Sequence, residues 1–167
     1  MIDSRPNASS CLEVDVQYAL NTGNAEAAEP EEPPSREQLI TWAEDAYSRV
    51  SDLQSELTIR LVGSEEMTEL NHQYRGNNKP TNVLSFRYEL DPDIELSLLG
   101  DVVICHDIIV QEAHQQNKLV MDHYAHMVTH GVLHLCGYDH QDDTQAEHME
   151  SLEVSILAAN GISNPYN

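Results

Sequence analysis

The sequence predicts an α+β fold in which helices cover a small, mixed, four-stranded sheet. Segments in which apolar and polar residues alternate, as in half-buried strands, occur four times between residues 11 and 105. Helical spacing of apolar residues separates some of these segments and dominates after about residue 107. The 167 residues are 40% hydrophobic, which is enough for one core. We therefore expect one domain over residues 1–167.

The amino-terminal part of the chain is expected to hold one strand and one long loop. Residues 11–18 (CLEVDVQY) alternate between apolar and polar side chains and predict the first strand. Residues 21–35 are rich in Ala, Glu and Pro and have no periodicity, as is typical of a surface loop. Residues 1–34 thus form a strand and an acidic, Pro-rich loop, and residues 35–160 the main region.

The first predicted helix begins after Ser35, because S-R-E-Q forms a capping box with Gln38 at the third helical position. Its apolar positions recur every three or four residues, at Leu39, Ala43, Ala46 and Val50. Residues 55–62 (SELTIRLV) alternate again and predict the second strand. Ser64 is expected to cap a second helix over about residues 65–74.

Two further strands are predicted at residues 82–88 (NVLSFRY) and 98–105 (LLGDVVIC). An acidic turn around Asp91–Asp93 separates them. The rest of the chain has a helical pattern, with one helix to about residue 116, one over about 121–135 and one over about 143–160.

Charge and cysteine content restrict the classes of partner and compartment. With 8 Lys and Arg against 29 Asp and Glu, the net charge is −21, which repels nucleic acid and anionic membranes at long range. Three of the eight cations, however, are Arg75, Lys79 and Arg87, whose clustering predicts a local anion site. No secretion signal, membrane span or paired-cysteine pattern is evident, so we expect a cytoplasmic protein.

The segment His130-Gly-Val-Leu-His134-Leu-Cys-Gly137-Tyr-Asp-His140 predicts a metal site on a helix and the turn that follows it. His130 and His134 are four residues apart and so share one helix face. Gly137 is able to adopt a left-handed conformation, end the helix and return His140 to that face. Three imidazoles with one open position are typical of a catalytic zinc site, with one zinc per chain.

This histidine spacing matches the metzincin protease pattern H-E-x-x-H-x-x-G-x-x-H at every position except one. Where the proteases carry a glutamate that serves as general base, this chain has Gly131. The metal geometry is therefore expected without the base of a peptidase. Asp101 and Asp139 are candidates to orient the histidines from behind, with solvent exposure of both as the simpler alternative.

Together, H-G-V-L-H-L-C-G-Y-D-H, Y-R-G-N-N-K-P-T-N-V-L-S-F and L-L-G-D-V-V-I-C resemble the motifs of the YbeY family of bacterial endoribonucleases and rRNA maturation factors. The resemblance implies a zincin-like fold, zinc held by the three histidines and a functionally important Arg75. It also implies maturation of the 16S rRNA 3′ end and ribosome quality control. Asn82 departs from the pattern, because many members have Asp there.

We therefore expect a zinc-dependent endoribonuclease that acts on single-stranded ribosomal RNA. Arg75 and His130 are the catalytic candidates, because a guanidinium suits a phosphoryl group and His130 holds the metal. Lys79 and Arg87 are the candidates for substrate binding. The expected partners are the small ribosomal subunit and its assembly proteins, and no membrane.

Two other functions are compatible with the same residues. The first is a zincin-type metallopeptidase or amidohydrolase, against which Gly131 argues. The second is a ribosome assembly factor without catalytic activity, in which the histidines and their metal stabilise the fold.

Overall fold

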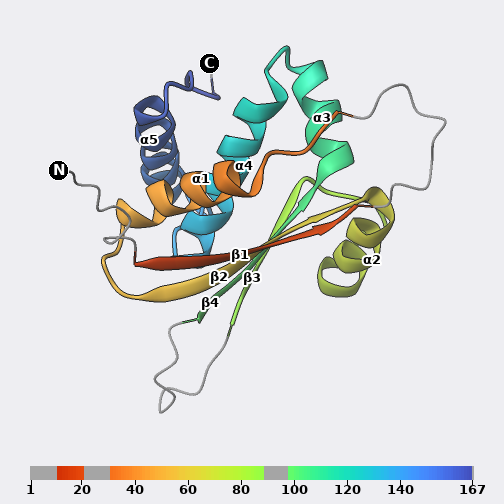
Figure 1. The fold of residues 1–167 in the computed structure, drawn as a ribbon, viewed down its shortest axis with the longest axis horizontal. Coiled ribbons are helices and arrows are strands. Elements are labelled where there is room, and N and C mark those ends of the chain that lie inside the picture. Colours follow the sequence, from red (N-terminus) through yellow and green to blue (C-terminus); the bar gives the residue numbers. More distant parts are fainter. Residues whose placement is uncertain (1–10, 21–30, 89–97, 167) are drawn as a thin grey trace.

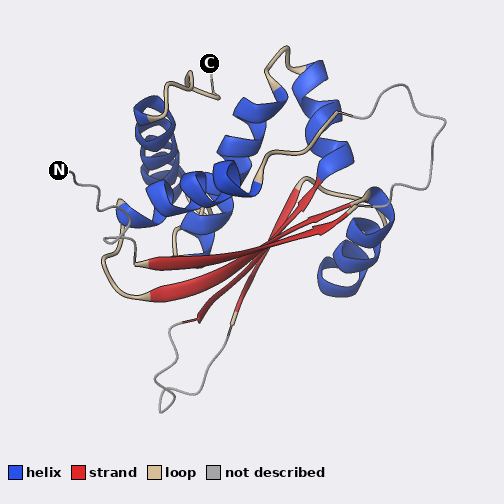
Figure 2. Cartoon of the chain, in the orientation of Figure 1, coloured by secondary structure: helices blue, strands red, loops and turns tan. Residues whose placement is uncertain are grey.

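The computed structural model describes residues 11–20, 31–88 and 98–166, and four strands in this part form one sheet (Figures 1 and 2). The strands are β1 (Leu12–Ala19), β2 (Ser55–Val62), β3 (Val83–Arg87) and β4 (Leu98–Cys105), in the order β1-β2-β4-β3. β1, β2 and β4 are parallel, and β3 runs antiparallel to β4. The predicted mixed four-stranded sheet is confirmed. The acidic turn at Asp91–Asp93 lies outside the described residues.

Helices cover both faces of this sheet. They are α1 (Arg36–Ser48), α2 (Ser64–Arg75), α3 (His106–Gln115), α4 (Val120–Leu135) and α5 (Asp143–Ala159). Figure 1 shows α1, α4 and α5 together on one side of the sheet and α2 on the other. The α+β class is thus confirmed, whereas the zincin-like relationship stays a prediction. Within the described part of the chain, no helix is long and apolar enough to cross a membrane.

The main core lies between the sheet and the α1, α4 and α5 layer. Alternate residues of β2, such as Ile59, and Val102 of β4 point into it and are fully buried. Tyr124 and Leu133 of α4 meet them from the helix side. Each such apolar side chain contributes about 1.5–3 kcal/mol on burial, so this layer supplies most of the driving force. A smaller cluster lies under α2 and includes Met67.

The two predicted helix starts have different outcomes. The capping box is confirmed, because the Ser35 hydroxyl accepts from the Gln38 amide at 3.2 Å and the Gln38 side chain accepts from the Ser35 amide at 2.9 Å. The prediction for Ser64 is wrong, because Gly63 occupies the cap position and Ser64 is the first helical residue. The Asp107 carboxylate accepts from the Ser64 amide at 3.1 Å and from its hydroxyl at 2.9 Å. A carboxylate from α3 thus caps α2.

Helix α4 lies close to the sheet at Gly131. A Cβ at this position would be 2.6 Å from a methyl group of Val102 and 3.3 Å from the Ser85 hydroxyl. The Ser85 hydroxyl also donates to the Gly131 carbonyl at 3.3 Å. Only a residue without a side chain permits this approach, which places the carboxyl-terminal turns of α4 over β3 and β4.

We expect Gly131→Ala to lower the free energy of unfolding by about 1–3 kcal/mol, because the added methyl overpacks this contact. Urea denaturation followed by circular dichroism measures the change.

The double variant Gly131→Ala/Val102→Ala provides the control, because it removes the methyl groups that the new Cβ would meet. It should lose less stability than the sum of the two single variants. Strictly additive losses would contradict the close contact.

Candidate metal centre

The structure brings together His130, His134 and His140. The first two lie on one face of α4, and Gly137 follows the helix with a φ of 101°. The amides of Gly137 and Tyr138 donate to the carbonyls of the last helical turn, both at 3.0 Å, as in a glycine-terminated helix. The predicted turn is therefore present. One ligand nitrogen from each of the three imidazoles lies within 4.8 Å of the other two.

The chemistry of this cluster suits a divalent metal ion. Three neutral imidazoles are donors that zinc and other late transition metals prefer. Partial burial is the main cause that lowers the pKa of His134, and the neighbouring His130 lowers it further. A lowered pKa keeps the imidazole neutral, and so able to bind a metal, to lower pH.

Glu153 of α5 is the carboxylate that contacts this cluster from behind, and sequence analysis missed it. Its side chain is 1% exposed and accepts from His130 Nδ1 at 3.1 Å and from His126 Nε2 at 2.9 Å. The Tyr166 hydroxyl donates to its other oxygen at 2.8 Å. Because His130 donates through Nδ1, its Nε2 would be available to bind a metal ion.

The hydrogen bonds of Glu153 keep its carboxylate ionised inside the protein. Burial by itself would raise the pKa of Glu153, but the bonds from His126 and His130 lower it to about 2. A buried negative charge close to three imidazoles also favours a bound cation electrostatically. Nothing in the spacing of the chain distinguishes Glu153 from the other carboxylates, because only the packing of α5 against α4 brings it to His130.

The two aspartates expected to orient the histidines lie in different places. Asp139 is beside His140, with its carboxylate accepting from the His140 amide at 2.7 Å and lying 3.9 Å from His140 Nδ1. This hydrogen bond is the main cause that lowers the pKa of Asp139. Asp101 instead accepts from the Tyr88 hydroxyl at 2.6 Å. Since the adjacent Val102 packs towards α4, Asp101 points to the opposite face of the sheet.

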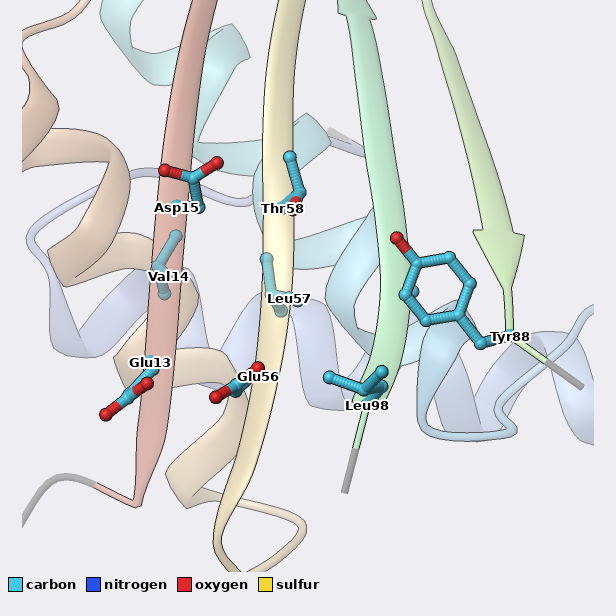
Figure 3. Close-up of a pocket in the computed structure, with 9 residues that line it drawn as sticks. Glu13, Val14, Asp15, Glu56, Leu57, Thr58, Tyr88 and Leu98 are labelled. Atoms are coloured by element: carbon cyan, nitrogen blue, oxygen red, sulfur yellow. The ribbon is translucent and has the colours of Figure 1, made fainter. Parts of the chain in front are cut away.

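That opposite face carries a hollow of about 400 Å³, shown in Figure 3. Glu13 and Asp15 of β1 and Glu56 of β2 line it, together with Tyr88. Three carboxylates in one wall repel a phosphate group, so this face is unsuited to RNA.

The three predicted cations differ in how they relate to the triad. Arg87 donates to the His134 carbonyl at 3.3 Å and so supports the last turn of α4. Arg75 ends α2, and its charge is among the weaker causes that lower the pKa of His134, after burial. Lys79 is exposed in the following segment. Within the described residues, none of the three forms an ion pair with a carboxylate.

Asn82, the departure from the family pattern, has a local role away from the triad. Its amide donates to Glu112 at 3.1 Å, and Glu112 lies 2.9 Å from the buried His123. A carboxylate at position 82 would repel Glu112, whereas the amide of Asn82 donates a hydrogen bond to it.

Comparison with known proteins agrees with this geometry. A family model described as Endoribonuclease YbeY matches residues 24–161. The chain belongs to the YbeY family. A protein of Colwellia psychrerythraea named Endoribonuclease YbeY is 52% identical over 143 residues, covering 84% of this chain and 92% of that protein. The resemblance of the three sequence motifs to the YbeY family is therefore confirmed.

The fold has a counterpart among solved structures. The solution structure of TM1509 from Thermotoga maritima matches with a TM-score of 0.55 and 23% identity, over 92% of this chain and 99% of that one. At this identity the likeness shows a shared fold. The four-stranded sheet and its helices are thus not peculiar to this YbeY-family chain.

We expect Glu153→Gln to weaken zinc binding about 10- to 100-fold, because an amide oxygen orients His130 without the negative charge. Competition against a chromophoric chelator measures the affinity, and circular dichroism verifies folding.

Glu147→Gln is the matched control, since Glu147 is an exposed residue of the same helix. Equal zinc affinity for Glu153→Gln and Glu147→Gln would mean that Glu153 does not support the metal site.

Proposed function

We propose that this protein is a zinc-dependent endoribonuclease that cleaves single-stranded RNA. Membership of the YbeY family supports the activity, as does a 52% identical relative named Endoribonuclease YbeY. The observation that carries the proposal is the cluster of three imidazoles together with Arg75, whose charge acts on His134 and which has no carboxylate partner in the described part of the chain. In biological terms we infer ribosomal RNA processing in the cytoplasm, with 16S rRNA 3′-end maturation and ribosome quality control.

The three histidines are the residues that would hold one zinc ion. When bound, zinc supplies a Lewis acid that polarises a phosphoryl oxygen and lowers the pKa of a water ligand towards ~7. Glu153 keeps His130 in the orientation and tautomer that this requires. Asp139 performs a related task for His140 by fixing the backbone of the turn.

The catalytic roles fall to Arg75 and His130. A guanidinium donates two parallel hydrogen bonds to phosphoryl oxygens and stabilises the negative charge that grows on them. Arg75 stands at the end of a helix and outside any ion pair of the described residues, so no carboxylate among them competes with a phosphate. Lys79 and Arg87 bind neighbouring phosphates of the same strand.

The overall charge of −21 has a consequence for the substrate. Long-range repulsion makes the affinity for free RNA weak, whereas the local cations act only at short range. The enzyme therefore works best on RNA presented by the small ribosomal subunit, where assembly proteins provide the docking contacts.

A peptidase activity is disfavoured by the packing of α4. The position that carries the catalytic glutamate in the related proteases is Gly131, where a Cβ would be 2.6 Å from Val102. A glutamate side chain does not fit there without displacing α4 from the sheet. Cleavage of RNA by an arginine and a metal requires no base at that position.

We expect the wild-type protein to contain about one zinc per chain and to cleave a single-stranded rRNA fragment. His134→Ala should lose both zinc and cleavage, because one of three ligands is gone. Arg75→Ala should retain zinc but lose about 10²- to 10³-fold in kcat, as for other charge-stabilising donors. Metal analysis and a gel-based cleavage assay measure the two properties.

Arg49→Ala is the matched control. It also removes a guanidinium, but one that donates to Ser155 of α5. It should cleave like the wild type. Equal cleavage by all four preparations would identify a contaminating nuclease, and a metal-stabilised assembly factor would then be the better interpretation.

A further inference from the structure

A second concave region of about 330 Å³ lies between the end of α2, the segment that follows it and α3. Its wall has a composition unlike that of the acidic hollow on the sheet face. It carries the cations Arg75 and Lys79 and, among its amide side chains, Asn71, Asn77, Gln111 and Gln115. We call it the amide hollow.

Most of these amides have unused hydrogen-bonding capacity. The side chains of Asn77, Gln111 and Gln115 form no hydrogen bond with any described residue. Asn71 is 2% exposed and donates to the Lys79 carbonyl at 2.8 Å, but its own oxygen is buried without a partner. The exposed amides of Asn77, Gln111 and Gln115 are therefore the groups of this wall that are available to a ligand.

Glu112, the carboxylate among the described residues of this wall, is held by neighbouring side chains. Its Oε1 accepts from Asn82 at 3.1 Å and lies 2.9 Å from His123 Nε2. The two cations have no carboxylate partner among the described residues. The amide hollow therefore combines positive charge with free donors and acceptors.

Arg75 connects the amide hollow to the metal centre. It lines the hollow, and the adjacent Tyr74 packs on Phe86 of β3 with ring centroids 4.8 Å apart, in the strand whose Arg87 donates to the His134 carbonyl. A single RNA strand whose phosphate contacts Arg75 would thus place one flanking nucleotide in the hollow. Amide groups present a donor and an acceptor together, which is the arrangement that reads the edge of an unpaired base.

We propose that the amide hollow is a base-reading subsite for a nucleotide of single-stranded RNA close to the cleaved bond. Gln111 of α3 and its neighbouring amides hydrogen-bond the base, while Lys79 and Arg75 hold the adjoining phosphates. The inference rests on the proposed ribonuclease function. It adds that cleavage depends on the base at one position of the substrate.

The test measures kcat/KM for zinc-loaded protein on short single-stranded RNAs in which one position at a time carries each of the four bases. The wild type should prefer one base at one position by about 5- to 100-fold, as for a well-formed pair of hydrogen bonds to a base. Gln111→Leu should remove most of that preference without changing zinc content. Lys79→Ala should weaken cleavage of every RNA alike and reduce its salt dependence.

Gln73→Leu is the matched control, because Gln73 is an exposed glutamine of α2 that does not line the hollow. It should keep the wild-type preference. If the wild type cleaves RNA but shows no preference at any position, or if Gln111→Leu retains the preference, the subsite is wrong and the ribonuclease stands. If zinc-loaded wild type cleaves none of the RNAs, the proposed function itself fails.

Discussion

The close contact between α4 and the sheet at Gly131 is the constraint on which the rest of the structure depends. Because the helix backbone approaches β3 and β4 without a side chain between them, the last turns of α4 are held over the edge of the sheet. His130 and His134 occupy those turns, and the left-handed Gly137 returns His140 to them. Two of the three histidines are therefore placed by the packing of α4 on the core.

The buried carboxylate of Glu153 connects this core to the histidine cluster. Glu153 belongs to α5, which packs on α4, and its burial is tolerated only because two histidines and a tyrosine donate to it. The same hydrogen bonds orient His130. Packing of α5 on α4 and orientation of His130 therefore depend on the same hydrogen bonds.

Local patterns in the sequence account for much of the fold and for the metal triad. Alternation located all four strands, the capping box at Ser35 located α1, and the spacing of three histidines around Gly137 located the cluster. Each of these depends on residues within about ten positions of one another, where backbone geometry alone dictates which side chains meet.

Such local patterns do not predict contacts between elements that are distant in the chain. Ser64 was expected to cap α2, but Asp107, more than forty positions later, provides the cap. Glu153 resembles every other carboxylate in an acidic chain until α5 packs on α4. Asp101 precedes Val102 and Val103, which belong to cores on opposite faces of the sheet, so alternation alone did not show that Asp101 points away from the histidines.

The Asp107 cap has a further consequence for the arginine at the other end of the same helix. α2 is held at its start by Asp107 and near its end by Asn71, which donates to the Lys79 carbonyl at 2.8 Å. The backbone that carries Arg75 therefore loses its conformational entropy during folding, before any substrate arrives. A ligand that contacts the Arg75 guanidinium therefore has only the side chain left to order, which lowers the entropic cost of binding.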